Sequence, residues 1–409
     1  MQPRSVLSAG SGPFPSLGIR SFRWLFISTM CGIVGFQMQN VAMGWLVYML
    51  THSALKLGIV TSAQALAQLT ISPVAGVIAD RVERRNYIIT VRFVTVAVGA
   101  ALTILIWTHR IAYWHLVVGA AIIGTGFGLN GPARQALLAD LVGPEYLLNA
   151  VSTMSGGMNV ARIVGPAVAG VLLGILGAGG VFFINTLLYG AVILAMLPVP
   201  RRFATAEREK DGIVRELIGG VDYVRTHGAI LTLLLFGVLP LFFAMPYVAL
   251  LPIFATQVWH GGSIAFGLLS SAPGLGGAVG ALVVTPLTGS RRKAPYMLLG
   301  ASAYGALLVA FALSPTIVLA LPVLAVAGFA TILYTSVNSA LVQSLTPNQM
   351  RGRVMSFYQM SFGLGQFGAL PASALAQVAG APLTVALGGS IVVLLSAGFA
   401  RFARRLREL

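Results

Sequence analysis

Long apolar segments recur along the whole chain, and they constrain its fold more than any other feature. A helix needs about 20 apolar residues to cross the hydrocarbon core of a bilayer. Twelve runs come close to or exceed this length: Phe22–Leu50, Leu57–Ala79, Tyr87–Thr108, Tyr113–Leu138, Ala150–Leu176, Val181–Val199, Ile230–Val258, Ala265–Leu287, Tyr296–Leu313, Thr316–Leu345, Val354–Ala379 and Leu383–Arg401. These runs predict an all-α membrane protein with twelve transmembrane helices.

Charged residues are few, and the basic ones gather in alternate loops. Only 9% of the residues are charged, 57% are hydrophobic, and the formal net charge is +16. The intervening loops carry only Lys56 and Arg110 as basic residues. Because loops rich in Lys and Arg stay in the cytoplasm, we expect both termini there, in a multi-pass protein of the cell (inner or plasma) membrane. The same clustering indicates that the positive charge sets topology, so we expect no nucleic-acid partner.

The longest polar stretch lies near the middle of the chain and divides it into two halves. We expect a disordered cytoplasmic N-terminus at 1–21, a six-helix bundle at 22–199, a cytoplasmic linker at 200–229, a second six-helix bundle at 230–401 and a cytoplasmic tail at 402–409. In the linker, Ile213, Leu217 and Val221 recur at helical spacing and predict a short amphipathic helix. Two pseudo-symmetric six-helix bundles are a recurring transporter layout.

An acidic residue among arginines links the predicted second and third helices. The segment reads Gly76-Val-Ile-Ala-Asp80-Arg81-Val-Glu83-Arg84-Arg85. Asp80 is suited to a charge-assisted contact with a helix N-terminus or a neighbouring arginine, whereas the alternative is a plain cytoplasmic loop. The segment resembles the loop signature of the major facilitator superfamily, Gly-x-x-x-Asp-Arg-x-Gly-Arg-Arg, with Glu83 at the glycine position. The resemblance implies a conformational gate made of Gly76, Asp80, Arg81, Arg84 and Arg85.

A second motif, Gly165-Pro166-Ala-Val-Ala-Gly170, lies in the predicted fifth helix. Proline removes a backbone donor, and small residues let helices approach closely. The motif resembles the antiporter motif of the superfamily, in which a Gly-Pro bend closes one side; Ser152 and Ala161 stand at earlier glycine positions of that motif. The resemblance implies that Gly165, Pro166 and Gly170 also belong to the gate, and it favours export.

Further segments resemble one branch of the superfamily, which holds the enterobactin exporter and macrolide efflux proteins. They are Phe22-Arg23-Trp24-Leu25, Pro132-Ala-Arg134-Gln-Ala-Leu-Leu, Asn149-Ala150 and Arg351-Gly-Arg353-Val354. The resemblance covers about Phe22 to Ala379. Near the cytoplasmic end of its helix, Arg134 is within pairing range of Asp80 or Asp140, and we assign it to the gate.

Polar side chains inside the apolar runs are candidates for substrate contact, because each costs free energy in lipid unless it faces a cavity or a partner. The helices that line the cavity in the resembled fold carry Gln37, Asn40, Asn159, Asn338 and Gln359. The alternative is that each joins neighbouring helices by hydrogen bonds.

Arg162 is the cation nearest to the middle of an apolar run, and no acidic residue lies at that depth. We add it to the expected substrate cavity, where it would attract an anionic group; the alternative is a structural cation held by water and carbonyl groups. Among the acids, only Asp80, Asp140 and Glu145 lie near a cytoplasmic helix end. Proton coupling is therefore implied by the resemblance alone.

Together these features predict a secondary active transporter that exports a small organic molecule, a drug or a siderophore, by alternating access. An uptake permease and a lipid flippase are the alternatives. No catalytic cluster, metal-ligand spacing or Walker-type phosphate loop occurs in the sequence. We therefore expect neither enzymatic activity nor a bound cofactor or metal. The resemblance implies that the proton gradient is the energy source. The expected partners are the small-molecule substrate and membrane lipid, and the expected state is a monomer.

Overall fold

The computed structural model describes residues 14–79, 81–201, 222–284 and 293–406. All regular structure in these ranges is helical. The chain forms two compact units, one of residues 1–50 with 63–206 and the other of residues 51–62 with 207–409. Most of the expected linker, including its amphipathic helix, lies outside the described residues, and so does Asp80.

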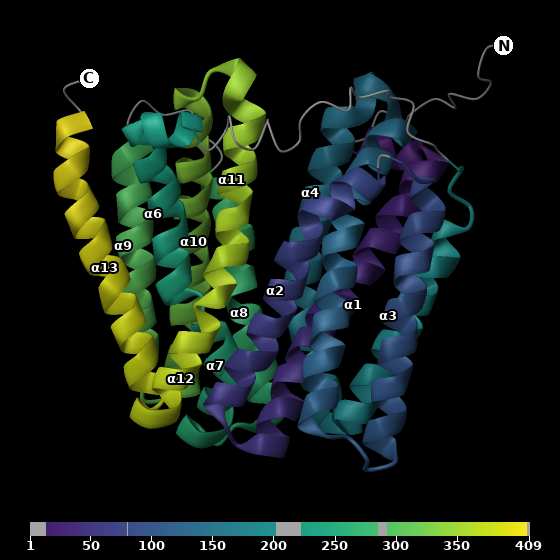
Figure 1. Cartoon of the computed structure of the whole chain (residues 1–409). Helices are drawn as coiled ribbons and strands as arrows, with labels where there is room; N and C mark the ends of the chain where they lie inside the picture. The colour runs from purple at the N-terminus through teal and green to yellow at the C-terminus, as the bar shows by residue number, and fades with distance from the viewer. Residues whose placement is uncertain (1–13, 80, 202–221, 285–292, 407–409) are drawn as a thin grey trace. The chain divides into compact units, whose positions relative to one another are not determined.

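The first unit contains a short 3-10 helix followed by long α-helices (Figure 1). They are η1 (Pro15–Gly18), α1 (Arg20–Thr51), α2 (Ala54–Ala79), α3 (Arg84–Trp107) and α4 (Tyr113–Met196). The last residue of α1 and the first part of α2, within residues 51–62, are grouped with the second unit. Part of the segment that we expected to be disordered is ordered as η1. The backbone N–H of buried Ser16 donates to Oδ1 of Asn149 at 3.2 Å, which attaches this 3-10 helix to α4.

The helix α4 contains three predicted spans because it turns sharply at two glycines. Gly143 has φ 72° and Gly177 has φ 66°, and the rest of the helix keeps helical dihedrals. Only glycine adopts such angles without steric cost, so these two residues allow the chain to reverse between spans. Pro166 lies within the regular part of α4, and the backbone breaks of this helix are at Gly143 and Gly177 instead.

In the second unit, the described residues from Gly228 on form a broken span, made of α6, α7 and η2, and six further helices. Its elements are α6 (Gly228–Ala244), α7 (Tyr247–Ile253), the π-helix η2 (Phe254–Val258), α8 (Gly262–Val284), α9 (Lys293–Ala312), α10 (Ile317–Leu345), α11 (Asn348–Phe367), α12 (Ala369–Ala379) and α13 (Ala381–Leu406). α11 begins six residues before the expected Val354. Its first turns are polar, so hydropathy missed them, while Pro347 favours a helix start.

The helices account for the twelve predicted spans. Nine helices in the described ranges are long and apolar enough to cross a membrane. One of the nine is α4, which supplies three spans through its turns at Gly143 and Gly177. The pair α11 and α12 supplies the twelfth. In lipid every backbone polar group must be satisfied internally, which explains why each apolar run became a helix.

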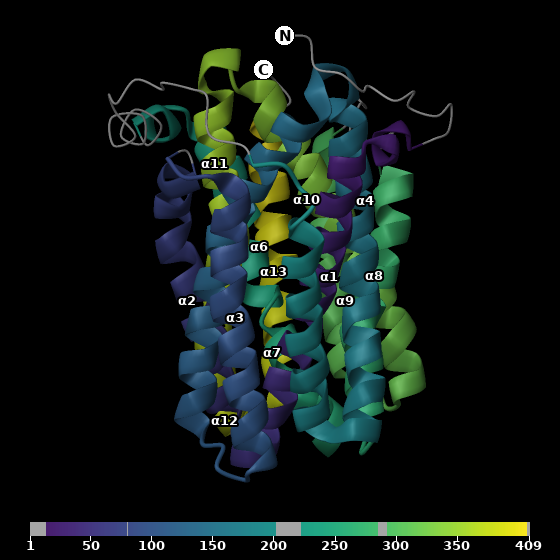
Figure 2. The same ribbon diagram turned by 90° about the vertical axis from the view of Figure 1, so that its right-hand side faces the viewer.

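Packing within each unit is close. In the first unit α3 packs along α4, and a core at one end gathers around Phe22, Leu137 and Met196. In the second unit α9 packs against both α10 and α13, and α10 also packs against α8 (Figure 2). Tyr334 is fully buried in that unit, and its hydroxyl donates to the carbonyl oxygens of Phe236 and Gly237.

Candidate functional site

Two of the expected cavity residues on α1 contact other helices of the first unit. Oδ1 of Asn40 accepts a hydrogen bond from Nε2 of Gln64 on α2, at 3.0 Å. Gln37 packs against Gly165 on α4, where an added Cβ would lie 2.6 Å from Cβ of Gln37. Gly165 therefore allows α1 and α4 to approach closely, which is the packing role that its motif predicts. Pro166 and Gly170 are buried on the same helix.

A polar network that we did not predict centres on Gln39. This side chain is 1% exposed, and its Oε1 accepts from Nδ2 of Asn185 at 3.0 Å and from the hydroxyl of Tyr189 at 2.9 Å. Arg92 then lies over the ring of Tyr189, with Cζ 5.1 Å from the ring centroid. The sequence signal for this network is Gln39 itself, a third polar residue beside Gln37 and Asn40 that lies on a different face of α1.

The basic loop residues anchor the start of α3. Glu83, which replaces the signature glycine, caps this helix by accepting hydrogen bonds from the backbone N–H groups of Arg85 and Asn86 at 2.9 and 3.0 Å. Arg84 is buried and pairs with Asp140 on α4, and Nε of Arg85 donates to the carbonyl oxygen of Met196 at 3.1 Å. The partner of Asp140 is therefore Arg84 and not Arg134.

Three residues of the expected gate remain: Gly76, Asp80 and Arg81. Arg81 is exposed in the turn before α3. The surroundings of Gly76 and the whole of Asp80 lie outside what the structure describes. The gating role of these residues stays a prediction.

Asp140→Asn is expected to destabilise the first unit, because the buried guanidinium of Arg84 loses an ionic partner. The expected cost is about 1 kcal/mol, since the carboxylate is partly exposed. Thermal unfolding of the purified protein measures it, and Glu145→Gln, which removes an exposed acid five residues later, is the matched control. The Arg84→Gln, Asp140→Asn double variant should then show coupling between the two sites. Equal unfolding temperatures for Asp140→Asn and Glu145→Gln would contradict this role.

Three arginines lie near one another in the first unit. Arg134 on α4 is half-buried, and both Arg92 and Arg162 are close enough to repel its charge. Arg162 itself is exposed, and Asn159, one turn earlier, is half-buried. Asn159 and Arg162 are three residues apart and therefore lie on one face of α4. The substrate role of both residues stays a prediction.

The expected cavity residues of the second unit fall in different places. Asn338 is fully buried, and its Nδ2 donates to the carbonyl oxygen of Leu233 at 3.3 Å, so it joins α10 to α6. Gln359 lies on α11, but its side chain is outside the described part. Helix–helix contact, the alternative role considered for such residues, is what the geometry of Asn338 provides.

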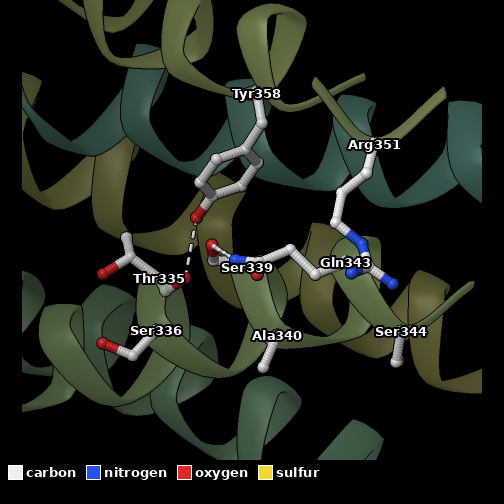
Figure 3. A pocket seen from close by; sticks show the side chains of 8 residues that line it. All are labelled: Thr335, Ser336, Ser339, Ala340, Gln343, Ser344, Arg351 and Tyr358. Atoms are coloured by element: carbon white, nitrogen blue, oxygen red, sulfur yellow. Dashed lines mark hydrogen bonds between the residues drawn. The ribbon is translucent and has the colours of Figure 1, made fainter. Parts of the chain in front are cut away.

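A pocket of about 670 Å³ lies between α10 and α11 (Figure 3). Its lining residues are Thr335, Ser336, Ser339, Ala340, Gln343, Ser344, Arg351 and Tyr358. Ser336, Ser339 and Gln343 lie three and then four residues apart on α10 and therefore share one helix face. This spacing is a sequence signal that we did not use, because the residues are near the end of an apolar run.

The pocket combines hydroxyl and amide groups with one cation. Nε2 of Gln343 donates to Oγ of Ser339 at 3.2 Å, and the hydroxyl of Tyr358 donates to the carbonyl oxygen of Thr335 at 2.7 Å (Figure 3). Arg351 is exposed at the start of α11, and no ion pair is found for it among the described residues. Such a lining suits a polar ligand with an anionic group, since a guanidinium binds carboxylates and similar anions through charge-assisted hydrogen bonds.

Comparison with protein families decides what kind of protein carries these features. Residues 11–409 match the family model for transmembrane secretion effectors. The chain belongs to this family. It is therefore a transporter of the major facilitator superfamily, a multi-pass membrane protein built from two bundles of six helices.

The chain is similar in sequence to several transport proteins. It is 25% identical to the Staphyloferrin A transporter of Staphylococcus aureus, over 94% of this chain and 97% of the relative. It is 28% identical to an enterobactin exporter of Citrobacter koseri, over 82% of this chain and 80% of the relative. It is 26% identical to macrolide efflux protein A of Streptococcus pyogenes, over 75% and 76%. These likenesses agree with the branch that the sequence motifs indicated.

Solved structures support the fold of the secretion effector. A POT family transporter in complex with 5-aminolevulinic acid superposes with a TM-score of 0.77 at 14% identity, covering 94% of this chain and 96% of the other. A bacterial homologue of the human lysosomal transporter Spinster gives 0.73 at 15% identity, covering 97% and 98%. At these identities the comparison concerns the fold alone.

Proposed function

We propose that this secretion effector exports a small organic molecule, a drug or a siderophore, by alternating access and with the proton gradient as its energy source. The observation that carries a small organic substrate is the pocket between α10 and α11. Its volume of about 670 Å³ falls in the range of about 300–1,000 Å³ that is typical of small-molecule sites.

The lining of the pocket supports a substrate with polar and anionic groups. Ser336, Ser339 and Gln343 supply hydrogen-bonding groups, while Arg351 supplies a positive charge (Figure 3). A ligand that covers these polar groups without forming hydrogen bonds to them removes their water and leaves the cost of desolvation uncompensated. A purely apolar compound therefore fits the pocket poorly. A siderophore with carboxylate or catechol groups fits this lining better than a hydrophobic cation does.

The direction of transport rests on the relatives. The names of the enterobactin exporter and macrolide efflux protein A both state movement out of the cell. The name of the Staphyloferrin A transporter states no direction, and uptake is therefore the second outcome that an assay must distinguish.

The proposed energy source is supported by the absence of a nucleotide-binding loop from the sequence. Export against a gradient needs coupling to another process, and the chain has no Walker-type loop for nucleotide hydrolysis. Superfamily resemblance then favours the proton gradient. Of the acids near the predicted cytoplasmic helix ends, Asp140 is paired with Arg84 and Glu145 is exposed. Glu145 is therefore accessible to water, and Asp140 is held in an ion pair.

Everted membrane vesicles test the direction and the coupling together. We expect them to accumulate substrate when their interior is made acidic, and nigericin, which dissipates the pH gradient, to abolish the accumulation. The compounds to assay are a macrolide, a carboxylate-bearing siderophore, a catechol-bearing siderophore and a hydrophobic cation. Vesicles without the protein give the background. Accumulation in right-side-out vesicles alone would indicate uptake, and accumulation that nigericin does not change would contradict proton coupling.

A further inference from the structure

A small internal cavity of the first unit is lined by two arginines. Its volume is about 20 Å³, which is room for a single occupant the size of a water molecule. The lining residues are Leu25, Ser28 and Thr29 of α1, Ile88 and Arg92 of α3, and Asn130, Arg134, Val192 and Met196 of α4. Arg92 and Asn130 are buried at 9% and 4% exposure. The cavity therefore brings together the buried guanidinium of Arg92 and the half-buried guanidinium of Arg134.

The hydrogen bonds around this cavity leave donors without partners. Nε of Arg92 is buried and unpaired. The hydroxyls of Ser28 and Thr29 already donate to carbonyl oxygens, those of Val192 and Leu25. Nδ2 of Asn130 donates to the carbonyl oxygen of Gly126 at 2.7 Å and has a second N–H available.

The positive charges around the cavity cost more free energy than its unpaired N–H donors do. Arg134 is repelled by Arg92 and by Arg162, so three cations lie in one region of a unit built from apolar helices. Buried charges are found paired, because the cost of removing an ion from water is several kcal/mol even after relaxation. A water molecule would satisfy the unpaired Oδ1 of Asn130, but it would not neutralise the arginines.

Protein acids do not supply the missing charge in the described part of this unit. The first 199 residues contain only four acids, Asp80, Glu83, Asp140 and Glu145. Glu83 caps α3, Asp140 pairs with Arg84 and Glu145 is exposed. Asp80 is the one acid of this part of the sequence that the structure does not describe.

We propose that the cavity between Arg92 and Arg134 binds one monoatomic anion, with chloride as the physiological candidate. The size of the cavity favours chloride or bromide over sulfate, phosphate or a substrate carboxylate, which need more room. The anion receives N–H donors from both arginines and from Asn130, and its single negative charge offsets part of the positive charge of a cluster that has no counter-ion among the described residues. The site is separate from the pocket between α10 and α11 and does not depend on the identity of the substrate.

Thermal unfolding of the purified full-length protein tests the site. Chloride is exchanged for gluconate at constant sodium concentration and ionic strength. We expect the unfolding temperature to rise with chloride and bromide until it saturates, because a ligand that binds only the folded state stabilises it, and not to rise with sulfate. Equal unfolding temperatures in chloride and gluconate would overturn the proposal and leave a buried water as the occupant.

Variants locate the effect. Arg134→Gln is expected to abolish the chloride-dependent rise, and in gluconate it should be at least as stable as the parent, because an unneutralised charge has been removed. Arg110→Gln, which removes an exposed loop arginine, should keep the whole rise. Asp80→Asn should keep it as well. A chloride response that appears only in Asp80→Asn would identify Asp80 as the counter-ion and overturn the proposal.

Bromide soaking of crystals of the unmodified protein gives a test that does not depend on any variant. An anomalous peak between the guanidiniums of Arg92 and Arg134 is the expected result. A saturating thermal response without such a peak would place the anion elsewhere and overturn the assignment.

Discussion

Gly276→Ala is expected to destabilise the second unit strongly, because α8 and α10 cross in contact at this residue. An added Cβ at Gly276 would overlap the carbonyl oxygen of Ala325. The obstacle is helix backbone, which cannot rotate away as a side chain can. Overpacking usually costs about 1–3 kcal/mol, and we expect a loss at the upper end of that range or above it. The unfolding temperature and the yield of monodisperse protein measure it.

The next residue provides a matched control for this crossing. An added Cβ at Gly277 would meet its nearest neighbour, Cγ1 of Ile332, at 3.5 Å, which is an ordinary contact. Gly277→Ala should therefore be tolerated. On the opposite helix, a Cβ added at Gly328 would overlap the carbonyl oxygen of Pro273, so Gly328→Ala should resemble Gly276→Ala. Similar stability of Gly276→Ala and Gly277→Ala would show that the helices do not approach this closely.

Arg351→Gln is expected to cause the largest loss of transport among variants that keep the fold. The residue is exposed at the start of α11 and lines the pocket, so its charge is available to a ligand (Figure 3). A hydrogen bond to a charged group is worth about 1.5–3 kcal/mol. We therefore expect KM for an anionic substrate to rise about 10–100-fold, whereas an uncharged substrate should change little. Initial rates in everted vesicles over a range of substrate concentrations measure both.

Two further variants separate charge from structure at this position. Arg351→Lys keeps the positive charge and should retain part of the affinity, although it loses the two-point geometry of the guanidinium. Arg401→Gln removes an exposed arginine near the end of α13 and should leave transport unchanged. Unchanged KM for anionic substrates in Arg351→Gln would remove the pocket between α10 and α11 from the proposed transport path.

The apolar runs were sufficient to predict the helices, because the requirement for about 20 apolar residues acts on each segment separately. The structure adds the turns at Gly143 and Gly177, which lie between the predicted runs. The polar first turns of α11 were not predicted, because a hydropathy pattern identifies only the apolar part of a helix. Sequence also indicated the superfamily, through the loop around Asp80 and the Gly165-Pro166 motif.

Partners across helices could not be predicted from the sequence. The pairing of Arg84 with Asp140 joins residues 56 positions apart, and Gln39 meets Asn185 over 146 positions. Which of several buried polar residues meet depends on the rotation of each helix about its axis, and packing sets that rotation. Asn338 is an example, because its sequence position did not indicate that its amide donates to a backbone carbonyl of α6.

The sequence by itself therefore determined the helical membrane fold, the number of spans and the type of transporter, because these follow from local hydropathy and short motifs. Tertiary structure alone decided that α10 and α11 line an open polar pocket with Arg351, and that Arg92 and Arg134 meet at a cavity with room for one small occupant. The pocket depends on how the consecutive helices α10 and α11 pack, and the cavity depends on how α1, α3 and α4 pack, at a particular angle and separation.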